Sequence, residues 1–165
     1  MNPEPWLRGP IAGVHPLVMP VFFSYAQVRE DLQKHTADLP DDRVWKPLTG
    51  NSLGFQLKHI AGSVDRITTY LMGQQLSAAQ LDFLKRELHP PPGKLSELLT
   101  LVEQNLDKSQ NQLHTLDPLS LYDPRAVGRR ALPTTVIGLI VHLAEHTQRH
   151  LGQAITMAKL LRQSG

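Results

Sequence analysis

Hydrophobic positions recur at spacings of three and four residues along two long stretches of the chain, which is the spacing of one face of an α-helix. In the stretch that begins near residue 50, these positions are Leu53, Leu57, Ile60, Val64, Ile67 and Leu71. In the last stretch, they are Val136, Ile140, Leu143, Leu151, Ala154, Ala158 and Leu161. Each pattern predicts a long helix that buries one face against the rest of the protein.

Prolines mark where the helices end, because a proline inside a helix removes a hydrogen bond and clashes with the preceding turn. The intervals between prolines predict four long helices, over residues 16–38, 52–74, 94–114 and 134–162, with Pro20 in the first turn of the first helix. A shorter helix is expected over residues 77–88. Asn51 or Ser52 can cap the second helix and Thr134 or Thr135 the fourth. No alternating run rich in β-formers and no Asn-Gly pair predicts a strand.

Four long amphipathic helices in 165 residues predict an all-α fold. We expect a four-helix bundle, with a short extra helix between the second and third long helices. The length suits a single domain over residues 1–165, in which residues 1–14 form an irregular N-terminal arm. The apolar content of 41% and the charged content of 19% are typical of a globular protein rather than a disordered one.

The composition excludes several classes of site and partner. The chain has no cysteine, which excludes disulfides, thiolate metal sites and cysteine nucleophiles. Its formal net charge is only +2, without a run of basic and aromatic residues, so nucleic-acid binding is not expected. The N-terminus does not resemble a signal peptide and no apolar segment is long enough for a membrane span. We therefore expect a cytoplasmic protein without membrane contact.

Histidine is abundant, with eight residues, and three of these fall within nine positions of the last predicted helix. His142, His146 and His150 are each four residues apart, so neighbours in this series lie one turn apart on one face. At about 100° per residue, His150 falls within the apolar arc, His146 at its edge, and His142 about 40° further towards the polar side. The pair His146 and His150 is therefore predicted to face the bundle interior, where bundles build metal sites.

A divalent ion needs a third protein ligand, and His59 in the second predicted helix is the best-placed residue for this role. Periodicity alone supports it weakly, since His59 lies off the main apolar stripe of its helix. His142 is interpreted as a surface residue, or as a residue that hydrogen-bonds a metal ligand or an incoming group without binding the ion itself. A rival reading is that His142, Glu145 and His146 form an H-x-x-E-H motif, as in one class of zinc peptidases.

Residues 57–61 (Leu-Lys-His-Ile-Ala), residues 146–153 (His-Thr-Gln-Arg-His-Leu-Gly-Gln) and the order of the helices resemble the DinB-like (DinB/YfiT-like) family. These are bacterial four-helix-bundle proteins inferred to be metalloenzymes. The resemblance implies that His59, His146 and His150 bind one divalent cation, with water or substrate completing its coordination. Arg149 stands where many members have histidine and Leu151 where many have arginine, which puts the substrate contacts rather than the ligands in doubt.

Three neutral imidazoles leave the positive charge of the ion at an open position, where a water or a thiol is activated. No glutamate lies between His146 and His150 to act as a general base. We therefore expect a metal-dependent thiol S-transferase or a related hydrolase, as the resemblance to thiol-dependent relatives implies. Its substrate would be a small molecule and its cosubstrate a low-molecular-weight thiol.

Several alternatives stay open. The chain could instead be a non-catalytic, stress-related metal-binding bundle, or a zinc hydrolase of the H-x-x-E-H type. Zn, Ni, Mn and Fe all accept imidazole ligands and are not distinguished. A homodimer is expected from the resemblance. Residues 122–131 are predicted to be an exposed loop, in which Arg129 or Arg130 could anchor an anionic substrate.

Overall fold

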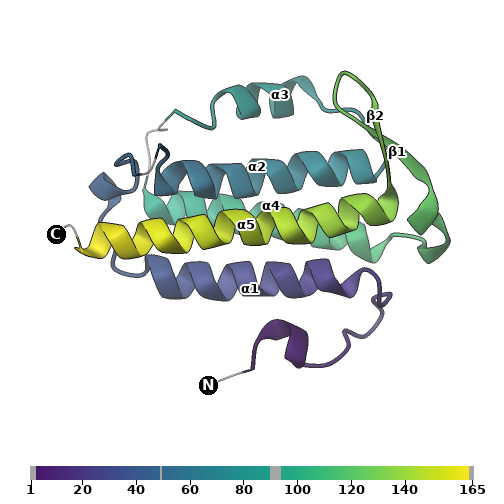
Figure 1. Cartoon of the computed structure of the whole chain (residues 1–165), viewed down its shortest axis with the longest axis horizontal. Coiled ribbons are helices and arrows are strands. Elements are labelled where there is room, and N and C mark those ends of the chain that lie inside the picture. Colours follow the sequence, from purple (N-terminus) through teal and green to yellow (C-terminus); the bar gives the residue numbers. More distant parts are fainter. Residues whose placement is uncertain (1–2, 49, 90–93, 164–165) are drawn as a thin grey trace.

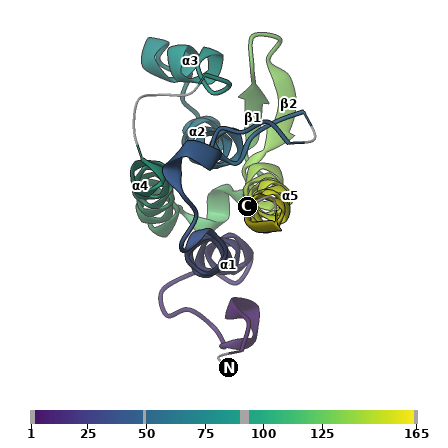
Figure 2. The ribbon, with the colours of Figure 1, turned by 90° about the vertical axis from the view of Figure 1, so that its left-hand side faces the viewer.

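The long helices lie side by side in a bundle, as the end-on view in Figure 2 shows. The computed structural model describes residues 3–48, 50–89 and 94–163. The long helices are α1 (Met19–Thr36), α2 (Leu53–Leu71), α4 (Leu95–His114) and α5 (Val136–Gln163). The short helix α3 (Ala78–Lys85) lies outside the bundle against α2 (Figure 1). The predicted all-α class and the extra helix between the second and third long helices are confirmed.

The predicted helix ends are close to the observed ones, and local backbone chemistry explains the differences. Pro20 lies in the first turn of α1, as expected. Beyond that helix, Asp38 has a positive φ of 63°, which a helix cannot accommodate. Gly73, with φ of 74°, likewise follows the end of α2, so the predicted end at residue 74 was three residues too long. Ser52 caps α2, because its Oγ accepts a hydrogen bond from the Phe55 backbone N–H at 3.1 Å.

The prediction of no strand was wrong for the segment before α5. Strands β1 (Pro124–Val127) and β2 (Leu132–Thr135) form an antiparallel hairpin, so residues 122–131 are not an ordinary loop. Each strand contains a proline, a residue that argues against a strand when the sequence is considered alone. Proline is tolerated here because each strand has only one partner, and the open edge needs no N–H donor.

The hairpin is attached where α2 ends and α5 begins (Figure 1). Arg125 Nε donates to the Leu71 carbonyl at 2.7 Å, and the Val136 N–H donates to the Asp123 carbonyl at 3.1 Å. The last helix therefore starts at residue 136 rather than 134. Thr135 still acts as its cap, since its Oγ1 accepts from the Gly138 N–H at 3.2 Å.

Part of the predicted irregular arm is ordered as the 3-10 helix η1 (Pro5–Leu7), which contacts α1; residues 1 and 2 lie outside the described part. The Arg8 guanidinium holds the arm there with two bonds to the Glu30 carboxylate, at 2.5 and 2.8 Å. Two further 3-10 helices, η2 (Asp41–Arg43) and η3 (Pro118–Tyr122), lie in connections between longer helices.

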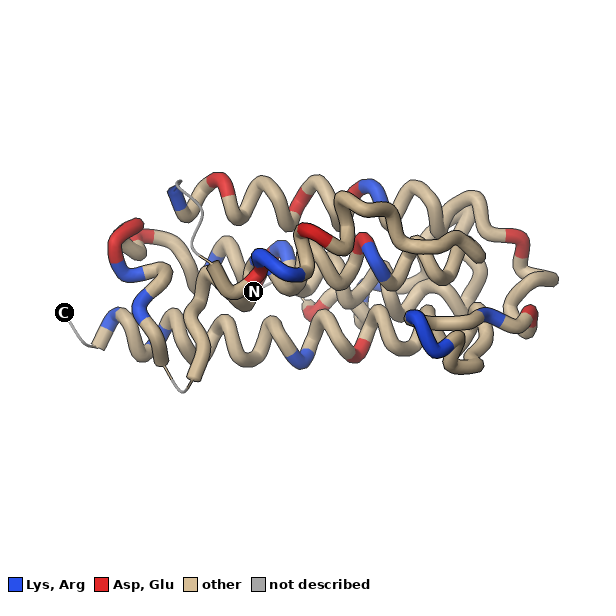
Figure 3. Tube along the Cα trace, turned by 90° about the horizontal axis from the view of Figure 1, so that it is seen from above, with Lys and Arg blue, Asp and Glu red and all other residues tan. Residues whose placement is uncertain are grey.

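Helix α2 is the most enclosed element, because α4, α5 and α3 all pack against it. Its apolar stripe is buried, and so are polar residues on its other sides, including Gln56, Lys58 and Arg66. Charges of both signs are interspersed along the chain in Figure 3. Within the described residues, no helix combines the length and apolar character that a membrane crossing requires.

Candidate metal centre

Three histidine side chains from two helices converge at the contact between α2 and α5. His59 comes from α2, whereas His146 and His150 lie one turn apart on α5. One ring nitrogen from each lies within 4.8 Å of the other two. The His59 and His146 Nε2 atoms are 3.1 Å apart. Two nitrogens on one tetrahedral zinc ion would be about 3.3 Å apart, given Zn–N bonds of about 2.0–2.1 Å. The predicted convergence is therefore present.

The other nitrogen of His59 is held by a buried carboxylate. Glu87, only 3% exposed, places Oε2 at 2.7 Å from His59 Nδ1 and Oε1 at 2.6 Å from Arg66 Nη1. A carboxylate accepts the Nδ1 proton, so a neutral His59 keeps its lone pair on Nε2, which faces the other histidines. Carboxylate–histidine pairs of this kind orient ligands in metal proteins.

Gln56 plays the corresponding role for His150. Its Oε1 lies 2.7 Å from His150 Nδ1, and its side chain is fully buried. An amide oxygen can only accept, so Nδ1 carries the proton and Nε2 carries the lone pair. His59 and His150 are thus held in the tautomer in which Nε2 is free to bind a cation.

The environment also keeps the two α5 histidines neutral. Burial and the neighbouring imidazoles lower the pKa of His146 and of His150 to about 4. Both rings are therefore unprotonated near pH 7, which is the state that metal binding requires. His146 Nδ1 is buried without a hydrogen-bond partner among the described residues. The donor set fits a divalent cation with three imidazole ligands.

The loop that carries Glu87 is bound tightly to α2. Lys58 Nζ donates to the backbone carbonyls of Arg86 and His89, on either side of Glu87. Gly62 leaves the space that the carboxylate occupies, because a Cβ there would lie 2.5 Å from Glu87 Oε1 and 2.7 Å from Arg66 Nη1. The sequence of α2 therefore positions a residue that lies far along the chain.

Sequence reasoning missed Glu87, Gln56 and Lys58. Glu87 fell inside the predicted short helix, and nothing in its neighbourhood indicates that it is buried. Gln56 left a usable signal: it lies three residues before His59 in an apolar helix, so the two polar side chains share a face. His59 lies off the apolar stripe and yet faces other helices, because α2 is packed on several sides and buries residues beyond that stripe.

The rival H-x-x-E-H group is also assembled. Ligand atoms of His142, Glu145 and His146 lie within 4.8 Å of one another. However, Glu145 accepts from His142 Nδ1 at 2.7 Å and from Arg149 Nη2 at 2.5 Å, at the exposed side of α5. His142 is 44% exposed and its ring lies 5.1 Å from that of His146, centroid to centroid. It bonds to Glu145 rather than to any of the three converging histidines.

Arg129 and Arg130 lie in the exposed turn of the hairpin, and no hydrogen bond or ion pair holds either of them within the described residues. The hairpin joins the start of α5 (Figure 1), and His146 lies ten residues beyond that start, about 15 Å along the helix axis. The structure does not bring these arginines into contact with the histidines. Arg149, between the two α5 histidines in sequence, is the nearer cation along the chain.

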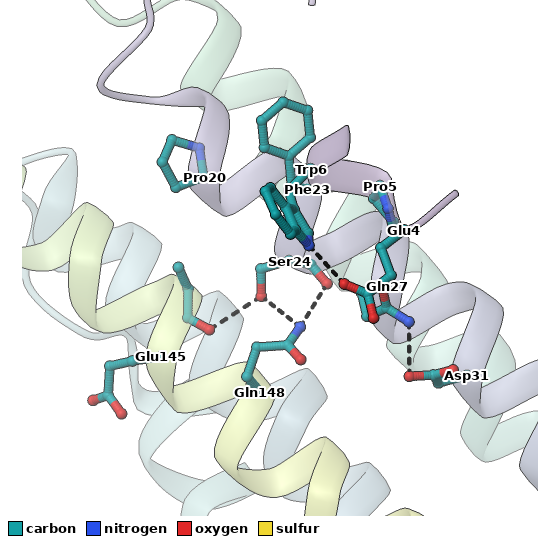
Figure 4. Close-up of a pocket in the computed structure, with 11 residues that line it drawn as sticks. Glu4, Pro5, Trp6, Pro20, Phe23, Ser24, Gln27, Asp31, Glu145 and Gln148 are labelled. Carbon is teal, nitrogen blue, oxygen red and sulfur yellow. Dashed lines mark hydrogen bonds between the residues drawn. The ribbon is translucent and has the colours of Figure 1, made fainter. Parts of the chain in front are cut away.

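Two cavities flank α5 on different sides. One, of about 360 Å³, lies between the start of α2 and the second half of α5 and is lined in part by Gln56 and Arg149. The other, of about 790 Å³, lies between η1, α1 and α5, with Trp6 and Phe23 in its wall (Figure 4). Only the smaller one includes a side chain that hydrogen-bonds one of the three histidines, because α5 turns Ala144 and Gln148 towards α1 in the larger one.

Comparison with known proteins agrees with the fold. A crystal structure of a Streptococcus pneumoniae protein from a structural genomics consortium aligns with a TM-score of 0.61 at 15% identity, covering 89% of this chain and 88% of that one. At this identity the likeness concerns the fold alone. No curated protein was found to match the sequence significantly. The sequence profile of the DinB superfamily matches residues 24–154, which is most of the chain, and the chain therefore belongs to that superfamily.

Proposed function

We propose that this protein is a metal-dependent enzyme that holds one divalent cation with His59, His146 and His150 and transfers a thiol to a small molecule. The observation that carries the proposal is the convergence of three imidazoles, of which two are held at Nδ1 by Glu87 and Gln56, so that their lone pairs lie on Nε2. A surface cluster formed by chance would not have buried partners on the outer nitrogens.

The bound ion would supply Lewis acidity, lowering the pKa of a thiol or water at its open position. The chain's own residues keep three ring nitrogens close to one point, and Glu87 and Gln56 occupy the outer nitrogens of His59 and His150. In the transfer, the thiol loses its proton to solvent and sulfur bonds to an electrophilic carbon. The leaving group departs with its electron pair. Glu145, the carboxylate that lies close to His146 on α5, is hydrogen-bonded to His142 and Arg149, and this engagement favours thiol transfer over a hydrolysis that needs a free general base.

The cavity beside Gln56 favours an enzyme over a purely structural metal site. A structural site is closed by four protein ligands, whereas a catalytic site keeps a position open towards a cavity. Here three histidines converge, and Gln56 both supports one of them and lines the cavity of about 360 Å³. A small substrate in this cavity would be separated from His150 by one hydrogen-bonded side chain, that of Gln56.

Metal content tests the binding half of the proposal. Protein purified without a nickel column should carry about one divalent ion per chain by elemental analysis. The variants His59→Ala and His150→Ala should lose it, whereas His142→Ala should retain it. Loss with His142→Ala and retention with His150→Ala would instead assign the ion to the H-x-x-E-H group.

Turnover tests the catalytic half. The loaded protein is incubated with an electrophile such as chlorodinitrobenzene and with several low-molecular-weight thiols, with and without a chelator. Conjugation that requires the metal and is lost in His59→Ala supports the transferase. A bound ion with no turnover on any pair would favour the non-catalytic bundle, and chelator-resistant turnover would refute the metal-enzyme proposal.

A further inference from the structure

The cavity between the start of α2 and the second half of α5 presents hydrogen-bond donors and one positive charge. Its wall includes Asn51, Gln56, Arg149, Gln153 and Thr156, and none of the residues that line it is acidic. A site of this composition favours a ligand with negative charge and several acceptor oxygens.

Gln56 contributes a buried donor that nothing in the described chain uses. Its Oε1 is committed to His150 Nδ1, and its Nε2 has no hydrogen-bond partner among the described residues. Buried polar atoms are nearly always paired, so an orphan amide beside a cavity indicates a missing acceptor. The orientation is not free to reverse: a His150 that uses Nε2 for a cation needs an acceptor at Nδ1, which only the amide oxygen supplies.

Arg149 supplies the charge. Its Nη2 bonds to Glu145 at 2.5 Å, while its other nitrogens donate to no acceptor in the described part of the chain. Its side chain is 58% exposed, so these N–H groups can reach a ligand. The planar guanidinium suits a carboxylate, which accepts two parallel hydrogen bonds.

We propose that this cavity binds the carboxylate of a reactant, with Gln56 Nε2 and Arg149 as donors, beside the three-histidine centre. This inference rests on the proposed function and adds a substrate class to it. Gln56 is a positioning residue for His150 and a contact for the ligand at once. The cation requires a His150 that is protonated at Nδ1, and this tautomer fixes the Gln56 amide with its N–H group available to the carboxylate. Each of the two ligands should therefore increase the affinity for the other.

The experiment measures binding rather than turnover. Benzoate and its neutral isostere benzamide are titrated by calorimetry into zinc-loaded and chelator-treated protein, with zinc content determined in parallel. We expect benzoate to bind the loaded protein at least tenfold more tightly than benzamide, and more weakly after chelation. Equal binding of the two probes would overturn the inference.

Matched variants locate the site. Gln56→Glu still accepts the His150 proton but loses the donor, so zinc should stay bound while benzoate affinity falls at least tenfold. Arg149→Gln should cause a similar loss. Lys108→Gln removes a positive charge that is equally exposed but lies on α4, and it should change nothing. Wild-type affinity in both Gln56→Glu and Arg149→Gln would refute the proposal.

A steric variant separates this cavity from direct coordination of the probe to zinc. Gly152 lines the cavity, and an added Cβ would meet no atom within 4 Å, so Gly152→Ala narrows it without disturbing the fold. Benzoate affinity should fall while zinc content stays at one per chain; an unchanged affinity would place the probe on the metal alone and overturn the inference. Absence of zinc from the wild type would instead count against the proposed function.

Two thiols identify which reactant carries the carboxylate. Mercaptoacetate and 2-mercaptoethanol differ mainly in that group. If Arg149→Gln weakens mercaptoacetate alone, the carboxylate belongs to the thiol cosubstrate. If it weakens benzoate but neither thiol, the carboxylate belongs to the acceptor. Both results support an anion site, whereas equal weakening of the two thiols would refute it.

Discussion

His59 shows how one residue depends on partners that are remote in sequence. Its Nε2 faces the α5 histidines, and its Nδ1 is bonded to Glu87, which Arg66 in turn neutralises. The ring is therefore oriented from both sides before any cation arrives. Orienting partners of this kind affect metal affinity almost as strongly as the ligands do.

The substitution Glu87→Gln should lower zinc affinity about 10–100-fold, because the amide oxygen is a weaker acceptor for the His59 proton and leaves Arg66 uncompensated. Competition with a chromophoric chelator measures the change. Asp82→Asn, which removes an exposed carboxylate bonded to Arg86 nearby, serves as the control and should have no effect. Equal affinities in wild type and Glu87→Gln would show that the carboxylate does not support the site.

A second residue-scale prediction concerns the core. Tyr25 is fully buried, and its hydroxyl is 2.8 Å from Ser109 Oγ, which is itself 2.7 Å from Thr68 Oγ1. Burial raises the pKa of Tyr25, so the phenol stays protonated. Tyr25→Phe removes one buried hydrogen bond and should lower the free energy of unfolding by about 1–2 kcal/mol in urea titrations. Zinc content should not change, since Tyr25 contacts α4 rather than the histidines.

Among the elements, α2 contributes most of the residues that position the candidate metal centre. It contributes His59, the two side chains that hold the Glu87 loop, and the glycine against which that loop packs. A glycine in mid-helix is normally unfavourable by about 1 kcal/mol relative to alanine. Here the close approach of Glu87, Phe83 and Arg66 accounts for it.

Gly62→Ala should therefore weaken zinc binding at least tenfold and destabilise the fold by about 1–3 kcal/mol, as overpacking does, despite the better helix propensity of alanine. Gly152→Ala is the matched comparison in α5, where the added methyl group meets open space. It should leave zinc affinity unchanged and stability equal or slightly higher. Chemical denaturation of both variants measures the change in stability, and competition with a chelator measures the change in zinc affinity.

The whole molecule should remain folded when no ion is bound. The bundle has an extensive buried core drawn from all four long helices, in contrast to small zinc domains that unfold when the metal is removed. Chelation should lower the melting temperature without loss of helical circular dichroism. At a free zinc concentration 100 times the dissociation constant, the stabilisation is about 2.7 kcal/mol. In His150→Ala, zinc should produce no such shift; a full shift there would mean that the ion binds elsewhere.

The long helices and the histidine pair on α5 could be predicted from local sequence patterns. Apolar spacing and prolines set the long helices to within a few residues, because these signals act locally. His146 and His150 shared a face because four residues make about one turn. The family resemblance, rather than periodicity, pointed to His59. The hairpin at residues 124–135 escaped prediction, since its pairing depends on where α2 and α5 place its ends.

Which side chains support the histidines, and which cavities flank α5, follows from how the helices pack. Glu87 and Gln56 reach His59 and His150 through space, 28 and 94 residues away along the chain. No local pattern records such a pairing. A buried carboxylate or amide is stable only when its partner is within hydrogen-bond distance, and that distance is set by how α2, α5 and the α3–α4 connection pack together.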